Sequence, residues 1–333
     1  MSATVTTGTP TVPGDAAYSA LASVMATATS PPEGVDPRLF YFGFIPNHDS
    51  NLAGLIIFAI LWVAQICLGL WYRQWWWLIT SFIACGLETA GYAGRFLGSL
   101  ADQVNNDDFL LQIVCLILAP AFLTGGMYYQ LAKLVTIYGH QFSPLKPMHY
   151  SALFISCDLF SIVLQAIGGG MAAGNDDGSK TGSNIMLAGI VFQVVSMLAF
   201  IIIFGWFTWR VWKANKVFGD GAFNPEFANL RRRPVLWLFL MALWVATTFV
   251  FVRCCYRVAE LAEGWNGYLM NTERYFLVLD GLMIFFATFA LTAIHPGFAL
   301  GRGVIAVDGL HTKKYLARNN SRSKEGLLTA PTA

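Results

Sequence analysis

Seven ionisable side chains lie within or at the edges of long apolar segments of this chain, where a lipid bilayer would oppose them. They belong to four of the segments: Glu88, Arg95, Asp158, Arg253, Arg257, Arg274 and Asp280. A charged side chain at the centre of a bilayer costs at least ~2.5–3.5 kcal/mol. Residues of this kind bind a polar ligand, carry protons or pair with one another inside the protein. Each is therefore a candidate for function or for internal pairing.

The carboxyl groups share a depth that differs from that of the arginines. Counting ~1.5 Å per residue from the middle of each segment places Glu88, Asp158 and Asp280 within about 6 Å of the membrane midplane. Two glutamines, Gln165 and Gln193, lie near the same depth. We therefore interpret these five polar residues as a layer that binds a headgroup.

Three arginines lie roughly 10–16 Å nearer the outer surface by the same count. With one further carboxylate they form the predicted countercharges: Arg95, Arg253, Arg257 and Glu260. Glu88 and Arg95 are seven residues apart, so they lie along one face of their helix, and so do Arg253 and Arg257, which are four residues apart. Depth also lets Asp280 meet Arg253 between neighbouring helices. Two interpretations remain open: internal ion pairs that fix the register of the helices, or a polar cavity that opens to the outer leaflet.

The overall composition is that of a membrane protein. Of 333 residues, 56% are hydrophobic and 12% are charged, against about 25% charged residues in soluble domains. The net charge of +2 and the lack of a basic stripe exclude a nucleic-acid partner. All six cysteines fall within apolar runs, without the spacing of a zinc cage or a disulfide framework.

Apolar runs of about 20 residues, long enough to cross a ~30 Å hydrocarbon core, recur seven times. We expect an all-α polytopic membrane protein with seven transmembrane helices. The predicted spans are 51–72, 75–97, 109–132, 150–172, 184–209, 235–257 and 274–294. They lie in a domain of residues 41–300. This domain follows a disordered extracellular tail, 1–40, and precedes a basic, disordered cytoplasmic tail, 301–333.

The distribution of Lys and Arg indicates the orientation, because short positively charged loops stay in the cytoplasm. With the N-terminus outside, the inner connections and the C-terminal tail hold fifteen Lys and Arg residues, whereas the outer segments hold only Arg38 and Lys180. We therefore predict an outer N-terminus and a cytoplasmic C-terminus. The basic inner segment from Arg210 to Arg233 could bind an anionic lipid or a cytosolic protein.

Several classes of membrane protein are excluded by the motifs that they need. The chain has no phosphate-binding loop, no lysine in its last apolar segment for a retinal Schiff base, and no set of histidines at membrane depth for zinc. No nucleophile, base and metal can be assembled into a catalytic centre. We therefore expect neither an enzyme nor a bound cofactor or metal.

Short motifs within residues 41–300 resemble those of a known family. They are Leu87-Glu88 with Gly91-Tyr92 and Gly94-Arg95, Ala119-Pro120-Ala121, Leu164-Gln165, Phe192-Gln193, Tyr256-Arg257 and His295-Pro296-Gly297. On these residues the chain resembles the RTA-like fungal lipid-translocating exporters, which include sphingoid long-chain base transporters and aminosterol-resistance proteins. The resemblance implies movement of amphipathic lipids or lipid-like toxins across the plasma membrane, with resistance to those compounds as the phenotype.

The residues themselves provide a physical basis for one class of cargo. A sphingoid base carries a cationic amine on a long apolar tail, and a midplane carboxylate could hold the amine while the tail stays in hydrocarbon. Members of the family are linked to other cargos, porphyrins among them, so the cargo and residence in internal membranes stay open. The alternative is a seven-helix sensor or receptor that regulates lipid asymmetry through cytosolic partners, since the sequence shows no energy-coupling motif.

Overall fold

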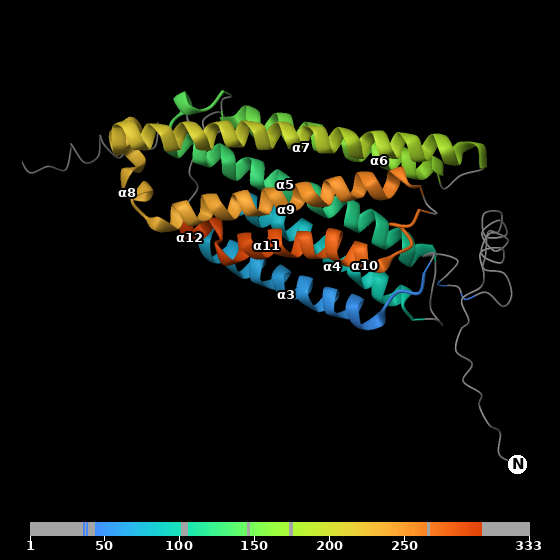
Figure 1. Ribbon diagram of the computed structural model, residues 1–333. Coiled ribbons are helices and arrows are strands. Elements are labelled where there is room, and N and C mark those ends of the chain that lie inside the picture. Colours follow the sequence, from blue (N-terminus) through green and yellow to red (C-terminus); the bar gives the residue numbers. More distant parts are fainter. Residues whose placement is uncertain are drawn as a thin grey trace, which may run out of the picture.

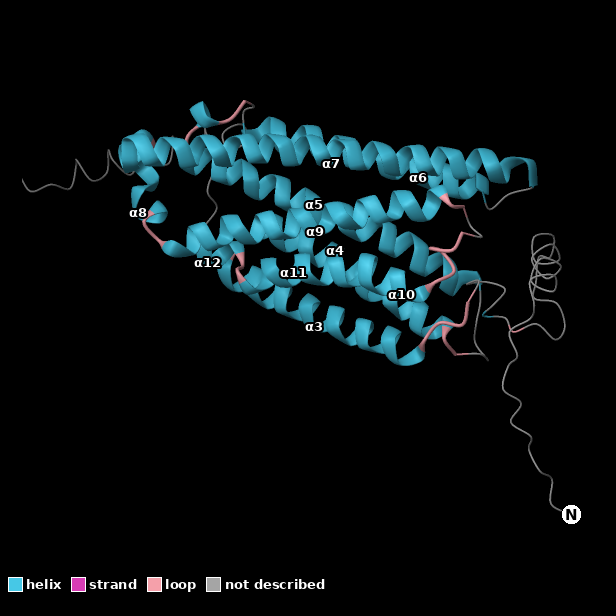
Figure 2. Cartoon of the chain, viewed as in Figure 1, coloured by secondary structure: helices cyan, strands magenta, loops and turns pink. Residues whose placement is uncertain are grey.

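The computed structural model describes residues 36, 38, 44–100, 106–144, 147–172, 176–264 and 267–301. Every regular element within these residues is a helix, and none is a strand (Figure 2). The predicted all-α class is therefore confirmed. The predicted tails, 1–40 and 301–333, lie outside the described residues except for Asp36, Arg38 and Gly301.

Seven long helical segments make up most of the described chain. Six are continuous: α3 (His48–Tyr72), α4 (Trp75–Gly98), α5 (Asn106–Tyr138), α6 (Pro147–Ala172), α7 (Asp176–Phe218) and α9 (Pro234–Ala262). The last consists of three consecutive pieces: α10 (Glu273–Tyr275), η4 (Phe276–Leu282) and α11 (Met283–Ala293). The remaining elements are short: η1 (His140–Phe142), η2 (Gly219–Ala222), η3 (Pro225–Phe227), α8 (Ala228–Arg231) and α12 (Pro296–Leu300).

The long helices form a closed ring. Each packs against the next one along the chain, from α3 to α4, α5, α6, α7, α9 and α11, and α11 packs back against α3. Figure 1 shows α6 and α7 along one edge of the bundle and α3 along the opposite edge. α5 also contacts α9. In the most apolar stretch of α5, 61% of the residues are buried, which is the largest share among the apolar helices. α5 is therefore the most buried of the apolar helices in the ring.

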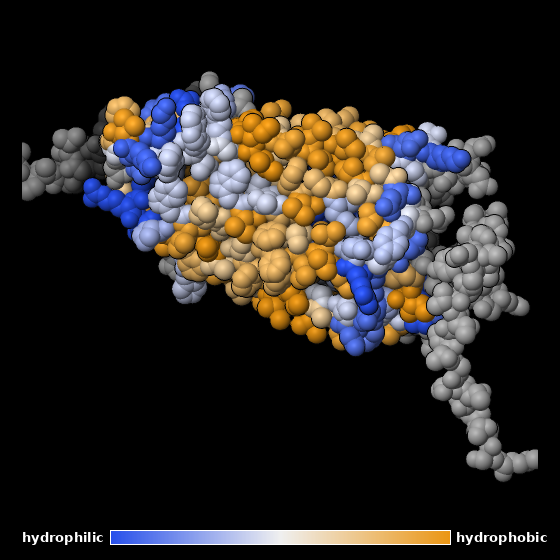
Figure 3. All heavy atoms as spheres, viewed as in Figure 1, coloured by the Kyte–Doolittle hydropathy of each residue, from blue (hydrophilic) through white to orange (hydrophobic). Residues whose placement is uncertain are grey.

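Six of these segments are long and apolar enough to cross a membrane: His48–Tyr72, Leu110–Tyr138, Pro147–Met171, Lys180–Phe218, Pro234–Ala262 and Glu273–Leu300. Apolar side chains cover the middle of the visible face of the bundle, and hydrophilic ones gather at its two ends (Figure 3). The distribution is that of a polytopic membrane protein, because a bilayer core accepts an apolar belt and excludes polar side chains.

The second predicted span, 75–97, falls on α4, which does not belong to this apolar group. Glu88, Arg95 and several glycines lower its hydropathy. Yet α4 has 24 residues and packs between α3 and α5, and its length of ~36 Å exceeds the thickness of a bilayer core. Its position suits a helix that crosses with the others while its polar face is turned toward protein.

α7 is much longer than the predicted span 184–209. It has 43 residues, so its length is ~64 Å, about twice the thickness of a hydrocarbon core. Figure 1 shows it along almost the whole bundle. The prediction was too short because hydropathy marks only the apolar part of a helix, and the flanking residues of α7 are polar yet helical.

Two local features set the geometry inside the ring. Gly168 allows α6 to lie against the backbone of α7, because a Cβ at this position would be 2.7 Å from the carbonyl oxygen of Gly182. The π-helix η4 interrupts the last long helix with a wider turn, and Asp280 lies buried within it. π-turns of this kind occur often at functional sites.

Candidate functional site

Acids and arginines from α4, α9 and the last long helical segment meet inside the ring of helices. We call this set the acid–arginine cluster; its members lie on α4, α9, α10 and η4 and are Glu88, Arg95, Arg253, Arg257, Glu260, Glu273 and Asp280. The three members on α9 follow one another at intervals of four and three residues, so they share one face of that helix. Helix periodicity thus presents them together to α4 and η4.

Asp280 holds the centre of the cluster. Its Oδ1 atom is 3.0 Å from Nε of Arg253 and 2.8 Å from Nε of Arg257. The predicted contact between Asp280 and Arg253 is confirmed. Arg257 also donates to Glu260 Oε2 at 2.8 Å, and the Tyr256 hydroxyl donates to the other oxygen of Glu260 at 3.1 Å. These bonds connect the centre of the cluster to Glu260.

Arg253 has a second bond that the sequence explains. Pro120 lies inside α5 and has no N–H, so the carbonyl of Leu116, four residues earlier, loses its helical donor. Arg253 Nη2 donates to this carbonyl at 2.5 Å. The proline therefore creates an acceptor that holds the guanidinium of α9 against α5.

Arg95, which shares a helix face with Glu88, finds its partners on other elements of the fold. Arg95 Nη2 lies 3.0 Å from Oε1 of Glu273, and its Nε donates to Asn51 Oδ1 at 2.8 Å. The guanidinium also lies 4.0 Å from the ring centroid of Phe276. Seven residues of helix separate Glu88 and Arg95 by ~10 Å along the axis, and the arginine extends outward to the start of α10 instead.

Glu88 lacks the partners that the other carboxylates of the cluster have. Its side chain is buried, and among the described residues its Oε1 atom has no hydrogen-bond partner. The charges that act on it are those of Arg253, Asp280 and Arg257. Glu88 thus faces the centre of the cluster without an ion pair of its own at Oε1.

Asp158 takes part in a different set of contacts. Its Oδ2 atom accepts hydrogen bonds from Thr124 at 2.8 Å and from the Tyr128 hydroxyl at 3.1 Å, both on α5. The predicted layer of three carboxylates therefore divides into Asp158, between α5 and α6, and Glu88 with Asp280 in the cluster. Depth along a helix predicts height in the membrane, but it does not predict which neighbour a side chain faces.

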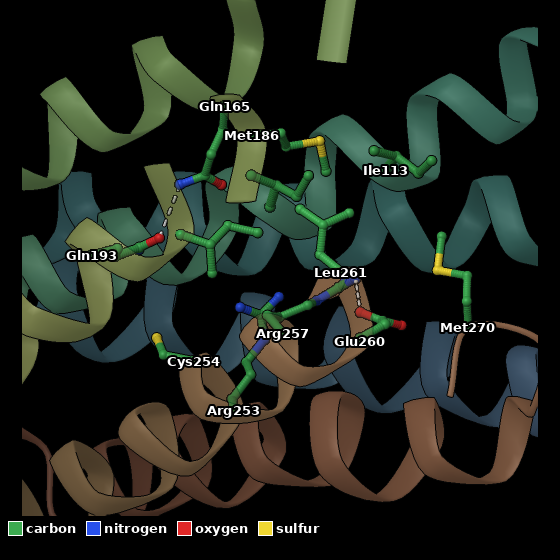
Figure 4. Close-up of a pocket in the computed structure, with 12 residues that line it drawn as sticks. Ile113, Gln165, Met186, Gln193, Arg253, Cys254, Arg257, Glu260, Leu261 and Met270 are labelled. Atoms are coloured by element: carbon green, nitrogen blue, oxygen red, sulfur yellow. Dashed lines mark hydrogen bonds and ion pairs between the residues drawn. The ribbon is translucent and has the colours of Figure 1, made fainter. Parts of the chain in front are cut away.

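A small cavity lies beside the cluster, between α5, α6, α7 and α9. Its polar lining comes from Gln165, Gln193, Arg253, Arg257 and Glu260, and its apolar lining includes Ile113, Met186 and Leu261. In Figure 4, Gln165 and Gln193 point toward each other on one side of this space, opposite the two arginines. Gln165 Nε2 donates to Gln193 Oε1 at 3.2 Å.

A second small cavity shares four lining residues with the first: Ile113, Arg257, Glu260 and Met270. Arg95, Gln112 and Phe276 line its far side. Arg257 and Glu260 therefore form the common wall of the two cavities. The three predicted carboxylates Glu88, Asp158 and Asp280 line neither of them.

Sequence reasoning missed Glu273, Asn51 and Gln112, which bind Arg95. The signal was weak, because polar residues near the ends of predicted spans are ordinary in loops. Arg274, counted among the ionisable residues within or at the edges of the predicted spans, is exposed at the start of the last helix. Among the described residues, no group of three or more His, Cys, Asp or Glu could hold a metal ion.

The basic segment 210–233, predicted to bind an anionic lipid or a cytosolic protein, has two parts. Lys213 and Lys216 lie on the last turns of α7 over the rings of Trp209 and Trp212. Arg231 is buried and donates to the carbonyl of Ile137 at 3.3 Å. Arg231 thus packs inside the protein, whereas Lys213 and Lys216 of α7 and Arg232 and Arg233 after α8 are exposed and offer charge for a partner.

Comparison with known proteins identifies relatives of this chain. The family model described as "RTA1 like protein" matches residues 81–303. The sphingoid long-chain base transporter RSB1 of Saccharomyces cerevisiae is 40% identical over 285 residues, which cover 78% of this chain and 74% of the relative. The protoporphyrin uptake protein 1 of the same organism is 30% identical over 206 residues, 61% of this chain and 63% of the relative. Saccharomyces cerevisiae protein RTM1 is 27% identical over 211 residues, 63% of this chain and 64% of the relative. No solved structure matches the chain.

Proposed function

The chain belongs to the RTA1-like protein family, and from this premise we propose that it translocates amphipathic lipids, sphingoid long-chain bases or similar lipid-like toxic compounds, across the plasma membrane. The match confirms the resemblance expected from the motifs. The relatives named by activity are a transporter and an uptake protein, in agreement with the expectation that the chain is not an enzyme.

The observation that carries this proposal is a cavity with one polar end and apolar walls. A sphingoid base has the same division, with an amine and hydroxyls at one end of a hydrocarbon chain. In the proposed complex, Gln165 and Gln193 bind the hydroxyls, and Glu260 accepts the ammonium. Arg257 can release Glu260 because it keeps its bond to Asp280 at 2.8 Å. The hydrocarbon chain follows Ile113, Met186 and Ile190.

The other predicted residues hold in place the helices and side chains that form the cavity. Asp280 fixes Arg253 and Arg257, Arg95 holds the start of the last helix through Glu273, and Asp158 joins α6 to α5. We propose that Glu88 responds to the charge of the cargo. The proposal also includes α4 as a seventh span, an outer N-terminus and a cytoplasmic C-terminus.

Reconstitution tests the function directly. Purified protein in liposomes is expected to move a fluorescent long-chain base from one leaflet to the other faster than protein-free liposomes do. Glu260→Gln should slow this movement at least tenfold, because it removes the carboxylate that accepts the amine. Glu226→Gln, the same change at an exposed position of η3, is the matched control and should keep the wild-type rate.

The same experiment separates the transporter from the sensor. Translocation by the protein alone contradicts a protein that acts only through cytosolic partners. Wild-type protein that is folded but moves no long-chain base contradicts the proposed transport function.

A further inference from the structure

The acid–arginine cluster contains unequal numbers of acids and bases. Its three arginines are Arg95, Arg253 and Arg257, and its four carboxyl groups are Glu88, Glu260, Glu273 and Asp280. Three carboxylates are in ion pairs with the three arginines. Glu88 is therefore the surplus acid of the described cluster.

Within the part of the chain that the structure describes, the surroundings of Glu88 offer no further cation. The groups that face it are Arg253 and Arg257 of α9, Asp280 of η4, Cys115 of α5, and Cys85 and Tyr92 of its own helix. From α3, the ring of Phe58 stacks on Tyr92 at 5.1 Å. Both arginines already bind Asp280. Glu88 itself is 3% exposed and its Oε1 has no hydrogen-bond partner among the described residues.

Electroneutrality then fixes the state of this carboxyl group. An unpaired charge is strongly disfavoured in a buried site, whereas a neutral carboxylic acid is tolerated. With a proton on Glu88, the three arginines balance the three remaining carboxylates. Without it, the cluster needs one additional positive charge.

We propose that Glu88 holds a proton while the cavity is empty and releases it when a cationic headgroup binds, so that one proton is exchanged for one monovalent lipid cation. This inference rests on the proposed function. The lipid enters as an ammonium ion, the carboxylic acid of Glu88 loses its proton to water, and the net charge of the cluster is unchanged.

A continuous set of contacts connects the cavity to Glu88. Glu260 lines the cavity and binds Arg257, Arg257 binds Asp280, and Asp280 binds Arg253. Arg253 is the largest attractive charge on Glu88. When an ammonium group binds Glu260, the ion pair between Glu260 and Arg257 weakens. The ion pair between Arg257 and Asp280 becomes stronger as a result. Asp280 then attracts Arg253 less, and Arg253 can balance the charge of an ionised Glu88 while it keeps its bond to the carbonyl of Leu116.

Proton release on binding is the direct test. The probe is N,N,N-trimethylsphinganine, whose quaternary ammonium has no proton of its own to lose. Added to purified protein in a weakly buffered solution with a pH indicator, it should release about one proton per molecule bound. One-proton linkage also makes its affinity rise about tenfold per pH unit. The neutral N-acetylsphinganine should release none.

Variants assign the proton to a residue. Glu88→Gln should abolish proton release and the pH dependence, and its thermal unfolding should match that of wild type, because glutamine resembles the protonated acid. Glu226→Gln should release the proton as wild type does. If Glu88→Gln fails to fold, the measurements on wild-type protein with the quaternary and neutral ligands still decide the question of exchange.

The outcomes separate this inference from the function on which it rests. Binding and translocation of the quaternary base without proton release overturn the exchange and leave the transport function standing. Proton release that persists in Glu88→Gln overturns the assignment to Glu88. Failure of the wild-type protein to bind any long-chain base overturns the transport function and the exchange together.

Discussion

Asp280 connects the two arginines of α9, since its Oδ1 atom is in ion pairs with both Arg253 and Arg257. Asp280→Asn would leave two buried guanidinium groups without this carboxylate. Removing one partner of a buried pair costs about 3–5 kcal/mol, so we expect a loss of stability of this order, measured by thermal or denaturant unfolding in detergent. Arg274→Gln, at an exposed position near the same cluster, should change stability by less than about 0.5 kcal/mol. Equal effects of the two variants would contradict the central role of Asp280.

Pro120 allows a second prediction at a single residue. Pro120→Ala restores an N–H that can bond to the carbonyl of Leu116, now the acceptor for Arg253. Proline inside a helix costs ~3 kcal/mol, so the variant should unfold at a higher temperature. It should also translocate long-chain bases more slowly, because Arg253 loses its anchor on α5. Pro144→Ala, in an exposed loop, is the control. A stabilised variant with wild-type transport would argue against a positioning role for Pro120.

The sequence predicted individual residues only in part. Depth and spacing predicted the contact of Asp280 with Arg253, because both residues point between adjacent helices at similar height. The partner of Arg95 was not predictable in the same way. Its side chain is long enough to reach Glu273, which lies outside the predicted spans and is close only because the ring closes.

At the scale of the helices, the pairing of α6 with α7 depends on Gly168. A Cβ there would meet the backbone of Met186 and the carbonyl oxygen of Gly182, so Gly168→Ala should force the helices apart and cost about 1–3 kcal/mol. Gly170→Ala, two residues further along the same helix, would meet nothing within 4 Å. Unfolding measurements should therefore show a loss for the first variant and little change for the second. Similar losses for both variants would contradict the role of close helix approach at Gly168, because alanine by itself favours the helix over glycine.

Predicted and observed helices agree where hydropathy alone decides. Each of the seven predicted spans falls on one of the long helical segments, with differences at the ends. The differences arise where polar residues continue a helix, as in α7, or where a polar face is covered by protein, as in α4. Neither the π-turn of η4 nor the order of packing around the ring leaves a mark in the hydrophobic pattern.

At the scale of the whole molecule, the number of crossings determines whether the two chain ends lie on the same side of the membrane. Seven spans place the ends on opposite sides, and six place them on the same side. We expect an epitope at the N-terminus to be labelled by antibody on intact cells, and one at the C-terminus to be labelled only after permeabilisation. Labelling of both ends on intact cells, or of neither, would show that α4 does not cross.

The π-helix η4 has an evolutionary consequence. A wider turn accommodates one more residue than an α-helix of the same length, and one residue corresponds to a rotation of about 100° around a helix axis. Loss of a single codon between Asp280 and Met283 would let the segment return to regular α-helix and turn Asp280 relative to α11, while α11 keeps its packing. Descendants of one ancestral gene could therefore gain or lose the arginine-binding carboxylate through one small insertion or deletion, and so acquire different cargos on an unchanged scaffold.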